Sequence, residues 1–361
     1  MSLANPVRIC LTPRVSGVGG MVSFQHKLAD GLQKRGVQVG YDLQDGPYQA
    51  VLVIGGTRRL AGLRRLRQRG IPVVQRLDGM NWLHRMHSSG LQSSGLRHFL
   101  RAEYGNLILT LVRNRLASLV VYQSRFVQGW WERKHGPTRV PSRVIYNGVD
   151  LGVYTPLGPE SPPADRLRLL MVEGSLMGGY EQGLQVAVEL VAQLAQTWSQ
   201  QAGKPVELMV VGRVPPELQR QYENRLAASL AGKTQLNWVG LVERERIPAI
   251  DRSAHLLYSS DINAACPNSV IESLACGLPV AAFDTGALPE LVTGDSGRIA
   301  PYGGDPWKLE HPDVAALAAA AGEILDEPER FRRAARQRAE QAFSLEAMVD
   351  AYLDALLGQV R

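Results

Sequence analysis

The chain is poor in cysteine and lacks any long apolar segment. Its three cysteines, Cys10, Cys266 and Cys276, are too few and too scattered for a disulfide framework or a zinc site, so we expect buried thiols. No run approaches the ~18 apolar residues that a membrane-spanning helix needs, and the N-terminus does not resemble a secretory signal. The seven histidines show no metal-ligand spacing. We therefore expect a cytoplasmic globular protein that uses neither a metal nor a cofactor.

Acidic residues are scarce in the first part of the chain. Residues 1–150 hold 22 Lys and Arg but 7 Asp and Glu, a net charge of +15, whereas the remainder holds 18 and 27, a net charge of −9. Such an imbalance reports on partners rather than on fold, so the basic part should face something anionic. We expect a lipid-linked or pyrophosphate-linked ligand and peripheral contact with an anionic membrane at its inner face. Nucleic acid is the rival explanation, but no nucleic-acid-binding motif supports it.

Arginine supplies most of this positive charge, and aromatic residues lie among the arginines. Solvated helix faces are an equally simple explanation for many of them. The residues concerned are Arg58, Arg59, Arg64, Arg65, Arg67, Arg69, Trp82, His84, Arg85, His87, Arg97, His98, Phe99 and Arg101.

Short apolar runs alternate with helix-like segments along the chain. Most of them lead into Gly, Ser or Asp, as is usual for strands buried on both faces of a parallel sheet. The runs are residues 7–13, 50–56, 71–79, 118–124, 143–150, 167–174, 206–213, 236–242, 255–260 and 278–284. Their arrangement in two blocks predicts two doubly wound α/β domains. We place an N-terminal domain at residues 1–152, a C-terminal domain at 153–345 and a final helix at 346–361.

Three loops fit the rule that ligands bind beyond the carboxyl ends of parallel strands. In the first, Gly17, Gly19 and Gly20 would let a ligand approach the backbone before a helix, although a flexible turn explains them equally well. The second is the stretch CPNSVIE at residues 266–272. The third, residues 284–290, follows a buried strand. Each loop is ambiguous when it is taken alone.

The CPNSVIE stretch predicts the start of a helix, with Asn268 as an N-cap type of residue after Pro267. The unpaired N–H groups of such a helix start suit a diphosphate. Glu272 would lie one turn inside, where its carboxylate can accept hydrogen bonds from a diol. A capped helix that carries a surface glutamate is the alternative interpretation.

Taken together, the ordered motifs resemble family 4 glycosyltransferases, also called glycosyl transferases group 1. The motifs are NGVD (147–150), VVG (210–212), WVGLV (238–242), SVIESLACGLPVAAFDTGALPELV (269–292) and SGRIA (296–300). The resemblance implies the GT-B fold, in which two Rossmann-like domains face each other across a cleft. It also implies a nucleotide-sugar in the C-terminal domain and a hydroxyl acceptor in the N-terminal domain.

The resemblance also implies roles for single residues. Glu272 would bind the nucleotide ribose, and the backbone N–H groups of Ser269 and Val270, next to Asn268, would hold the diphosphate. Gly19 and Gly20 would lie near the phosphates across the cleft. The family needs no metal, and its members retain the anomeric configuration of the transferred sugar. The final helix would pack back on the N-terminal domain.

The chain departs from the family at three donor contacts. Ala264 stands where the family has a sugar-binding glutamate, Ser175 where it has an arginine, and Gln182 where it has a lysine. Losing two charged contacts would cost about 3–6 kcal/mol of binding. Arg213, Arg244 and Arg246 could replace them, although an exposed surface position is the simpler explanation for Arg244 and Arg246.

On the acceptor side, the loop after residues 71–77 carries the most reactive groups. We expect Arg76 and Asn81 to bind the acceptor, and Asp78 to be the catalytic group near the reacting sugar, with His84 second. Asp78 could instead cap a helix that begins near Met80.

We therefore predict a metal-independent glycosyltransferase for cell-envelope glycan or glycolipid synthesis. The alternative is a catalytically weakened GT-B scaffold that binds a glycan or a protein, which the three departures favour. A lesser alternative is a nucleotide-sugar epimerase, which needs no acceptor.

Overall fold

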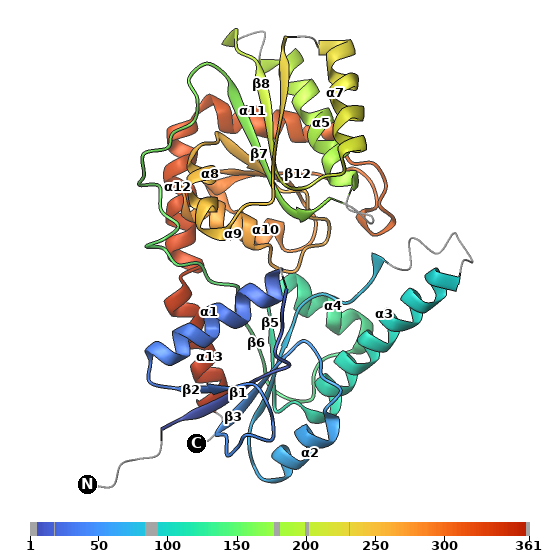
Figure 1. Ribbon diagram of the computed structural model, residues 1–361, viewed down its shortest axis with the longest axis vertical. Coiled ribbons are helices and arrows are strands. Elements are labelled where there is room, and N and C mark those ends of the chain that lie inside the picture. The colour runs from blue at the N-terminus through green and yellow to red at the C-terminus, as the bar shows by residue number, and fades with distance from the viewer. Residues whose placement is uncertain are drawn as a thin grey trace. The chain divides into compact units, whose positions relative to one another are not determined.

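A computed structural model describes residues 6–17, 19–83, 93–176, 181–198, 202–230 and 232–358 (Figure 1). The chain forms two compact units. The first unit joins Met1–Gly148 to Leu345–Arg361, and the second is Val149–Ser344. The domain limits expected from the sequence, after residues 152 and 345, differ from these by a few residues. In the described part of the chain, no helix is long and apolar enough to cross a bilayer.

The first unit contains a six-stranded parallel sheet in the order β2-β1-β3-β4-β5-β6. Its central strands are buried on both faces, because helices cover each side and the strands are mainly apolar, although β4 also carries the buried Gln75 and Arg76. The strands are β1 (Arg8–Thr12), β2 (Gln38–Gly40), β3 (Ala50–Ile54), β4 (Val73–Leu77), β5 (Leu119–Tyr122) and β6 (Ser142–Val144).

Helices from both ends of the chain complete the first unit. Helix α13 packs on α1, where a Cβ atom on Gly31 would lie 2.4 Å from Val349, so the small glycine lets the two helices approach closely. The Oγ atom of Ser124 caps α4 by accepting from the N–H group of Val127 at 3.2 Å. The helices are α1 (Gly20–Lys34), α2 (Leu60–Gln68), α3 (Ser93–Leu111), the π-helical turn η2 (Val112–Leu116), α4 (Arg125–His135) and α13 (Leu345–Leu357).

The second unit has its own six-stranded parallel sheet, in the order β12-β11-β10-β7-β8-β9. A continuous core joins the sheet to α5 and α11, with Leu190, Val210 and Leu317 fully buried. The strands are β7 (Leu167–Ser175), β8 (Val206–Arg213), β9 (Thr234–Gly240), β10 (Leu256–Tyr258), β11 (Val280–Phe283) and β12 (Gly297–Ala300).

The helices of the second unit follow the strands as the doubly wound pattern predicts. They are α5 (Glu181–Gln196), α7 (Pro216–Leu230), η3 (Arg244–Arg246), α8 (Ile247–Arg252), α9 (Asn268–Ala275), α10 (Leu288–Leu291), η4 (Gly294–Ser296), η5 (Pro306–Lys308), α11 (Val314–Asp326) and α12 (Pro328–Ala342).

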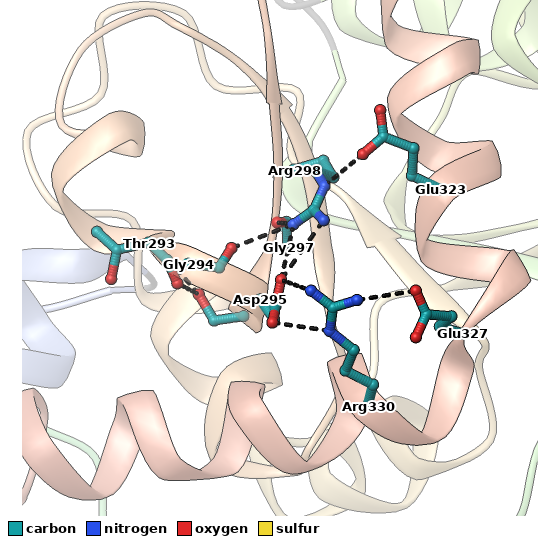
Figure 2. Close-up of polar contacts among 9 residues, drawn as sticks. Thr293, Gly294, Asp295, Gly297, Arg298, Glu323, Glu327 and Arg330 are labelled. Carbon is teal, nitrogen blue, oxygen red and sulfur yellow. Dashed lines mark hydrogen bonds and ion pairs between the residues drawn. The ribbon is translucent and has the colours of Figure 1, made fainter.

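A network of ion pairs ties α12 to the turn before β12 (Figure 2). Arg330 donates to both carboxylate oxygens of Asp295, at 2.8 and 2.9 Å, and Arg298 donates to Glu323 at 2.6 Å. The guanidinium groups of Arg298 and Arg330 both lie over the ring of Phe331. These contacts fix the start of α12 away from the strand ends that carry the candidate site.

Candidate functional site

In the second unit, the carboxyl ends of β7 and β8 bring two predicted donor-binding residues together. Ser175 ends β7, Arg213 ends β8, and the two residues are partners in the β-ladder. Both residues are exposed. An arginine on the neighbouring strand therefore lies beside the position at which the family's arginine is missing.

Helix α9 begins where the sequence predicts, but its cap differs from the expected one. Pro267 occupies the N-cap position, Asn268 is the first helical residue, and no side chain caps the helix. A proline supplies neither a side-chain acceptor nor an N–H group, so the side chain at this position cannot satisfy the first-turn N–H groups. The backbone of Asn268, Ser269 and Val270 thus forms the uncapped first turn, as an anion-binding helix start requires.

Glu272 lies one turn inside α9 and is 9% exposed. Its Oε1 atom lies 3.8 Å from Nη2 of Arg244, so one of the three arginines proposed as replacements faces the predicted ribose-binding carboxylate. Asp251 lies nearby: burial and the neighbouring Glu272 raise its pKa well above the usual range, and it shares a hydrogen bond with the Cys276 thiol. The arrangement favours a neutral Asp251.

Sequence reasoning missed two further carboxyl groups at this edge of the sheet. Glu173 follows the buried part of β7, and Asp261 follows β10, the adjacent strand. The Oγ atom of Ser260 donates to Glu173 at 2.6 Å. Burial and the neighbouring Asp261 raise the pKa of Glu173 to about 8, and burial raises the pKa of Asp261 to about 6. The sequence signal for these groups is an acidic residue at the end of a buried strand, the same signal that singled out Asp78.

At two of the departures from the family, Gln182 and Ala264, the residue contacts a neighbouring loop. Gln182, at the position of the family's lysine, donates to the carbonyl oxygens of Leu309 at 3.1 Å and Glu310 at 3.3 Å. It therefore anchors the loop that follows β12. Ala264 lies against Gly286, where an added Cβ atom would come within 2.4 Å of the Ala264 nitrogen. The close approach of the two loops requires glycine at position 286, which also has a positive φ of 59°.

In the first unit, the glycine loop leads into α1 as expected. Gly19 is the N-cap of α1, with a φ of 144°, and no side chain caps the helix. A Cβ atom at Gly17 or Gly19 would meet no atom within 4 Å, so these glycines serve backbone conformation rather than packing. Gly20 is the first helical residue.

The structure places Arg76 in the core of the first unit, whereas the sequence analysis expected it to point toward a cleft. Its side chain is 1% exposed, with the guanidinium carbon 3.8 Å from the centre of the Phe24 ring. Nη2 donates to Oδ1 of Asn147 at 2.9 Å, while Nε and Nη1 have no partner. The face of the strand that carries Arg76 is covered by α1, so a residue of β4 on that side is buried.

Asp78 follows β4, and burial raises the pKa of its carboxyl group, partly offset by Arg76. Its backbone carbonyl accepts from Nε1 of Trp131 at 2.8 Å, which fixes the loop on α4. The backbone N–H group of Asn81 donates to Oδ1 of Asn106 in α3 at 3.0 Å, and Nδ2 of Asn106 donates to the backbone carbonyl oxygen of Asn81 at 3.0 Å. Asn81 thus has a structural role at the base of α3, and the role in acceptor binding stays a prediction. His84 lies outside the described residues.

Within the described residues, no group of three or more His, Cys, Asp or Glu side chains is arranged to hold a metal ion. The three cysteines are free and buried.

Comparison with known proteins now identifies the second unit. Residues 168–327, which contain Ser175, Arg213 and Glu272, match the family model described as glycosyl transferases group 1. The chain carries a glycosyl transferases group 1 domain.

Among curated proteins, the chain is 27% identical over 140 residues to a 2-deoxystreptamine N-acetyl-D-glucosaminyltransferase of Streptomyces fradiae. The aligned residues cover 39% of this chain and 31% of that protein. It is 30% identical over 141 residues to a GDP-mannose-dependent alpha-(1-6)-phosphatidylinositol dimannoside mannosyltransferase of Mycobacterium tuberculosis, over 38% and 32% of the two chains. The matched region thus spans about a third of the length of these relatives.

Solved structures resemble the whole chain. Sucrose-phosphate synthase from Thermosynechococcus elongatus has a TM-score of 0.70 at 18% identity, over 98% of this chain and 99% of that one. HepE of Anabaena, solved with UDP and glucose, has a TM-score of 0.64 at 16% identity, over 98% and 100%. The chain therefore has the GT-B fold, as the glycosyl transferases group 1 resemblance implied.

Proposed function

We propose that the protein transfers a sugar from a nucleoside diphosphate sugar to a hydroxyl acceptor. The observation that carries this proposal is the buried Glu272 facing Arg244, one turn inside an uncapped helix start in the glycosyl transferases group 1 domain. A carboxylate at this place can accept both hydroxyl hydrogens of a ribose. The N–H groups of the first turn of α9 can donate to a diphosphate.

The donor would be held by the second unit. Arg213, beside Ser175, supplies a cation for the diphosphate, and Arg244 supplies another beside the ribose-binding carboxylate. Two guanidinium groups and a helix N-terminus can stabilise the leaving diphosphate, so we propose that the reaction needs no metal. We also propose that the reaction retains the anomeric configuration, with the donor's own phosphate oxygen, or a nearby group, taking the acceptor proton.

The acceptor would be held by the first unit, near Asp78. Burial raises the pKa of the Asp78 carboxyl group, which supports the catalytic role near the reacting sugar that we propose for it. The first unit holds 23 of the 40 Lys and Arg residues and 9 of the 34 Asp and Glu residues, a net charge of +14. This charge favours a glycan or lipid-linked acceptor at an anionic membrane and supports a cell-envelope role.

A binding scaffold with weak turnover is the second candidate, and the contacts of Gln182 favour it. Because Gln182 is engaged by the loop after β12, it is not placed to replace the family's lysine. A transfer assay separates the two candidates. Release of nucleoside diphosphate from a panel of nucleotide-sugars, with glycan and lipid-linked acceptors and with EDTA, should depend on one donor and one acceptor. NMR of the product should show the donor's anomeric configuration.

No release with any pair, together with tight binding of a glycan, would favour the scaffold. Conversion of a donor without an acceptor would instead indicate an epimerase.

A further inference from the structure

Helix α3 presents an uncovered apolar face. Five large side chains of this helix are 38–61% exposed, although each is leucine or tyrosine. They form what we call the apolar stripe, and its members are Leu96, Leu100, Tyr104, Leu107 and Leu111. The opposite face is buried against the first unit through Asn106 and Ile108.

The spacing of the apolar stripe makes it one continuous surface. Successive members are four, four, three and four residues apart, which places them on a single face of an α-helix. From Leu96 to Leu111 this face extends over ~22 Å at 1.5 Å per residue. Single exposed leucines are ordinary on soluble proteins, but a contiguous apolar row marks an interaction surface.

Arginine side chains border the apolar stripe. The guanidinium carbon of Arg58 lies 5.5 Å from the centre of the Tyr104 ring. Arg64 and Arg67 of α2 line a hollow together with Leu111 and Arg115, and Arg67 donates to the carbonyl oxygen of Arg115 at 2.7 Å. Arg97 and Arg101 are exposed on α3 itself. The apolar row therefore lies within a positively charged surface.

We propose that the apolar stripe and its arginines dock the protein on an anionic lipid bilayer. An interfacial helix of this kind lies in the plane of the membrane, with its apolar face among the acyl chains and its arginines at the phosphate groups. Figure 1 shows α3 extending along the outside of the first unit, with its ribbon free along much of its length.

A second copy of the chain fits the stripe less well. Five arginines border the stripe (Arg58, Arg64, Arg67, Arg97 and Arg101), whereas α3 contains a single acidic residue, Glu103. Pairing two such faces would bring like charges together and would cost free energy. A lipid surface supplies the missing anions. The docking surface uses none of the donor-binding residues, so its test does not depend on the proposed transfer reaction.

The test is co-flotation of the full chain with vesicles of phosphatidylcholine, with and without phosphatidylglycerol. The protein should bind the anionic vesicles, and added salt should weaken the binding because it screens the arginines. The double variant Leu100→Gln/Leu107→Gln should reduce the partition coefficient about tenfold or more, since each leucine buries apolar area. Glutamine is a good helix former, so α3 should persist, which circular dichroism would verify.

Matched controls distinguish the stripe from general exposure of leucine. Leu157 and Leu241, in the second unit, are 81% and 54% exposed, so Leu157→Gln/Leu241→Gln removes similar exposed leucines elsewhere and should leave flotation unchanged. Arg64→Gln/Arg67→Gln should lower binding to the anionic vesicles and reduce its salt dependence.

Three results would overturn the proposal. They are no binding to anionic vesicles, equal binding by the stripe variant and the control variant, and a dimer in solution that the stripe variant dissociates. The last result would assign the face to a second copy. Nucleotide-induced thermal stabilisation in the same variants reports separately on the donor site.

Discussion

The first unit buries a cation near the carboxyl end of β4, whereas the second unit holds two half-buried carboxyl groups at the ends of β7 and β10. Arg76 has two guanidinium nitrogens without a partner, and Glu173 and Asp261 share a site in which burial raises both pKa values. Net charge follows the same division, with +14 in the first unit and, from the remaining 17 basic and 25 acidic residues, −8 in the second.

Both sheets are parallel and six-stranded, although their strand orders differ, and each carries charged groups toward the carboxyl ends of its strands, of opposite sign in the two units. Arg76 and Glu173 lie in the last residues of β4 and β7, and Asp261 follows β10, which is the end at which parallel sheets bind ligands. A buried guanidinium group with two nitrogens that lack hydrogen-bond partners costs free energy, so Arg76 is a candidate for a role other than stability. The predictions below test that difference.

Two buried arginines of the first unit offer the largest contrast. Arg113 is fully partnered: it donates to Tyr122, Asn114 and Gly136 at 2.6–2.9 Å. Arg113→Met should lower the free energy of unfolding by about 3–5 kcal/mol, because it leaves buried partners unsatisfied. Arg76→Met removes a poorly partnered buried charge, so it should be neutral or raise stability by up to about 1–4 kcal/mol.

Urea unfolding of both variants would measure the difference. If Arg76 serves the acceptor, Arg76→Met should also lower kcat/KM for the acceptor while stability is kept. Equal destabilisation of the two variants would show that Arg76 is an ordinary structural residue.

The replacement of the family's basic residues predicts the next largest effect. Arg213→Gln and Arg244→Gln should each weaken nucleoside diphosphate binding by about 1.5–3 kcal/mol, the usual value of a charged hydrogen bond. Calorimetry would measure the loss. Arg246→Gln, also in the turn η3, is the matched control and should bind normally. If Arg246→Gln loses as much affinity as Arg244→Gln, the pairing of Arg244 with Glu272 does not account for nucleoside diphosphate binding.

The carboxyl pair of the second unit predicts a pH dependence. The folded state raises the pKa of Glu173 to about 8, so it keeps a proton that the unfolded chain has already released. The free energy of unfolding should therefore be fully retained below the unfolded pKa and fall as pH rises through about 8, by at most about 1.4 kcal/mol per pH unit.

Nucleotide affinity should fall over the same interval, since ionised Glu173 and Asp261 repel a diphosphate. Glu173→Gln should flatten both profiles between pH 6 and 8. If Glu173→Gln keeps the native dependence of unfolding free energy and nucleotide affinity on pH, the titrating group lies elsewhere.

The ion-pair network at the start of α12 predicts the smallest effect. Hydrogen bonding from Arg330 lowers the pKa of Asp295, so its stabilising contribution is present above the unfolded pKa and is lost as pH falls through the folded pKa. Asp295→Asn should cause a small fall in Tm at neutral pH, less at high salt, because these groups are exposed and screened. Nucleotide binding should not change. A loss of binding would mean that the network supports the donor site.

Most of the fold could be predicted from the sequence, because strands buried on both faces produce apolar runs that stand out from the helices between them. The start of α9 and the position of Glu272 were likewise readable from CPNSVIE. The burial of Arg76 was not, since it depends on α1 covering that face of β4. The pairing of Ser175 with Arg213, and of Arg244 with Glu272, joins residues far apart in sequence. Tertiary packing decides such contacts, and no local motif reports them.

The apolar stripe shows the same limit. Leucines at helical spacing usually pack in a core, and the residues of α3 follow that pattern without revealing which face is covered. Only the placement of α3 on the first unit separates the buried Ile108 from the exposed Leu107.

The central claim is that the second unit binds a nucleoside diphosphate sugar through Glu272. Its most direct test is calorimetry with a panel of nucleotide-sugars in EDTA, on the native protein, on Glu272→Gln and on the control Glu217→Gln, whose carboxylate is 79% exposed on α7. One donor should bind the native protein and the control alike, and Glu272→Gln should bind it about 10 to 150 times more weakly. Binding of no donor, or equal binding by all three proteins, would contradict the account.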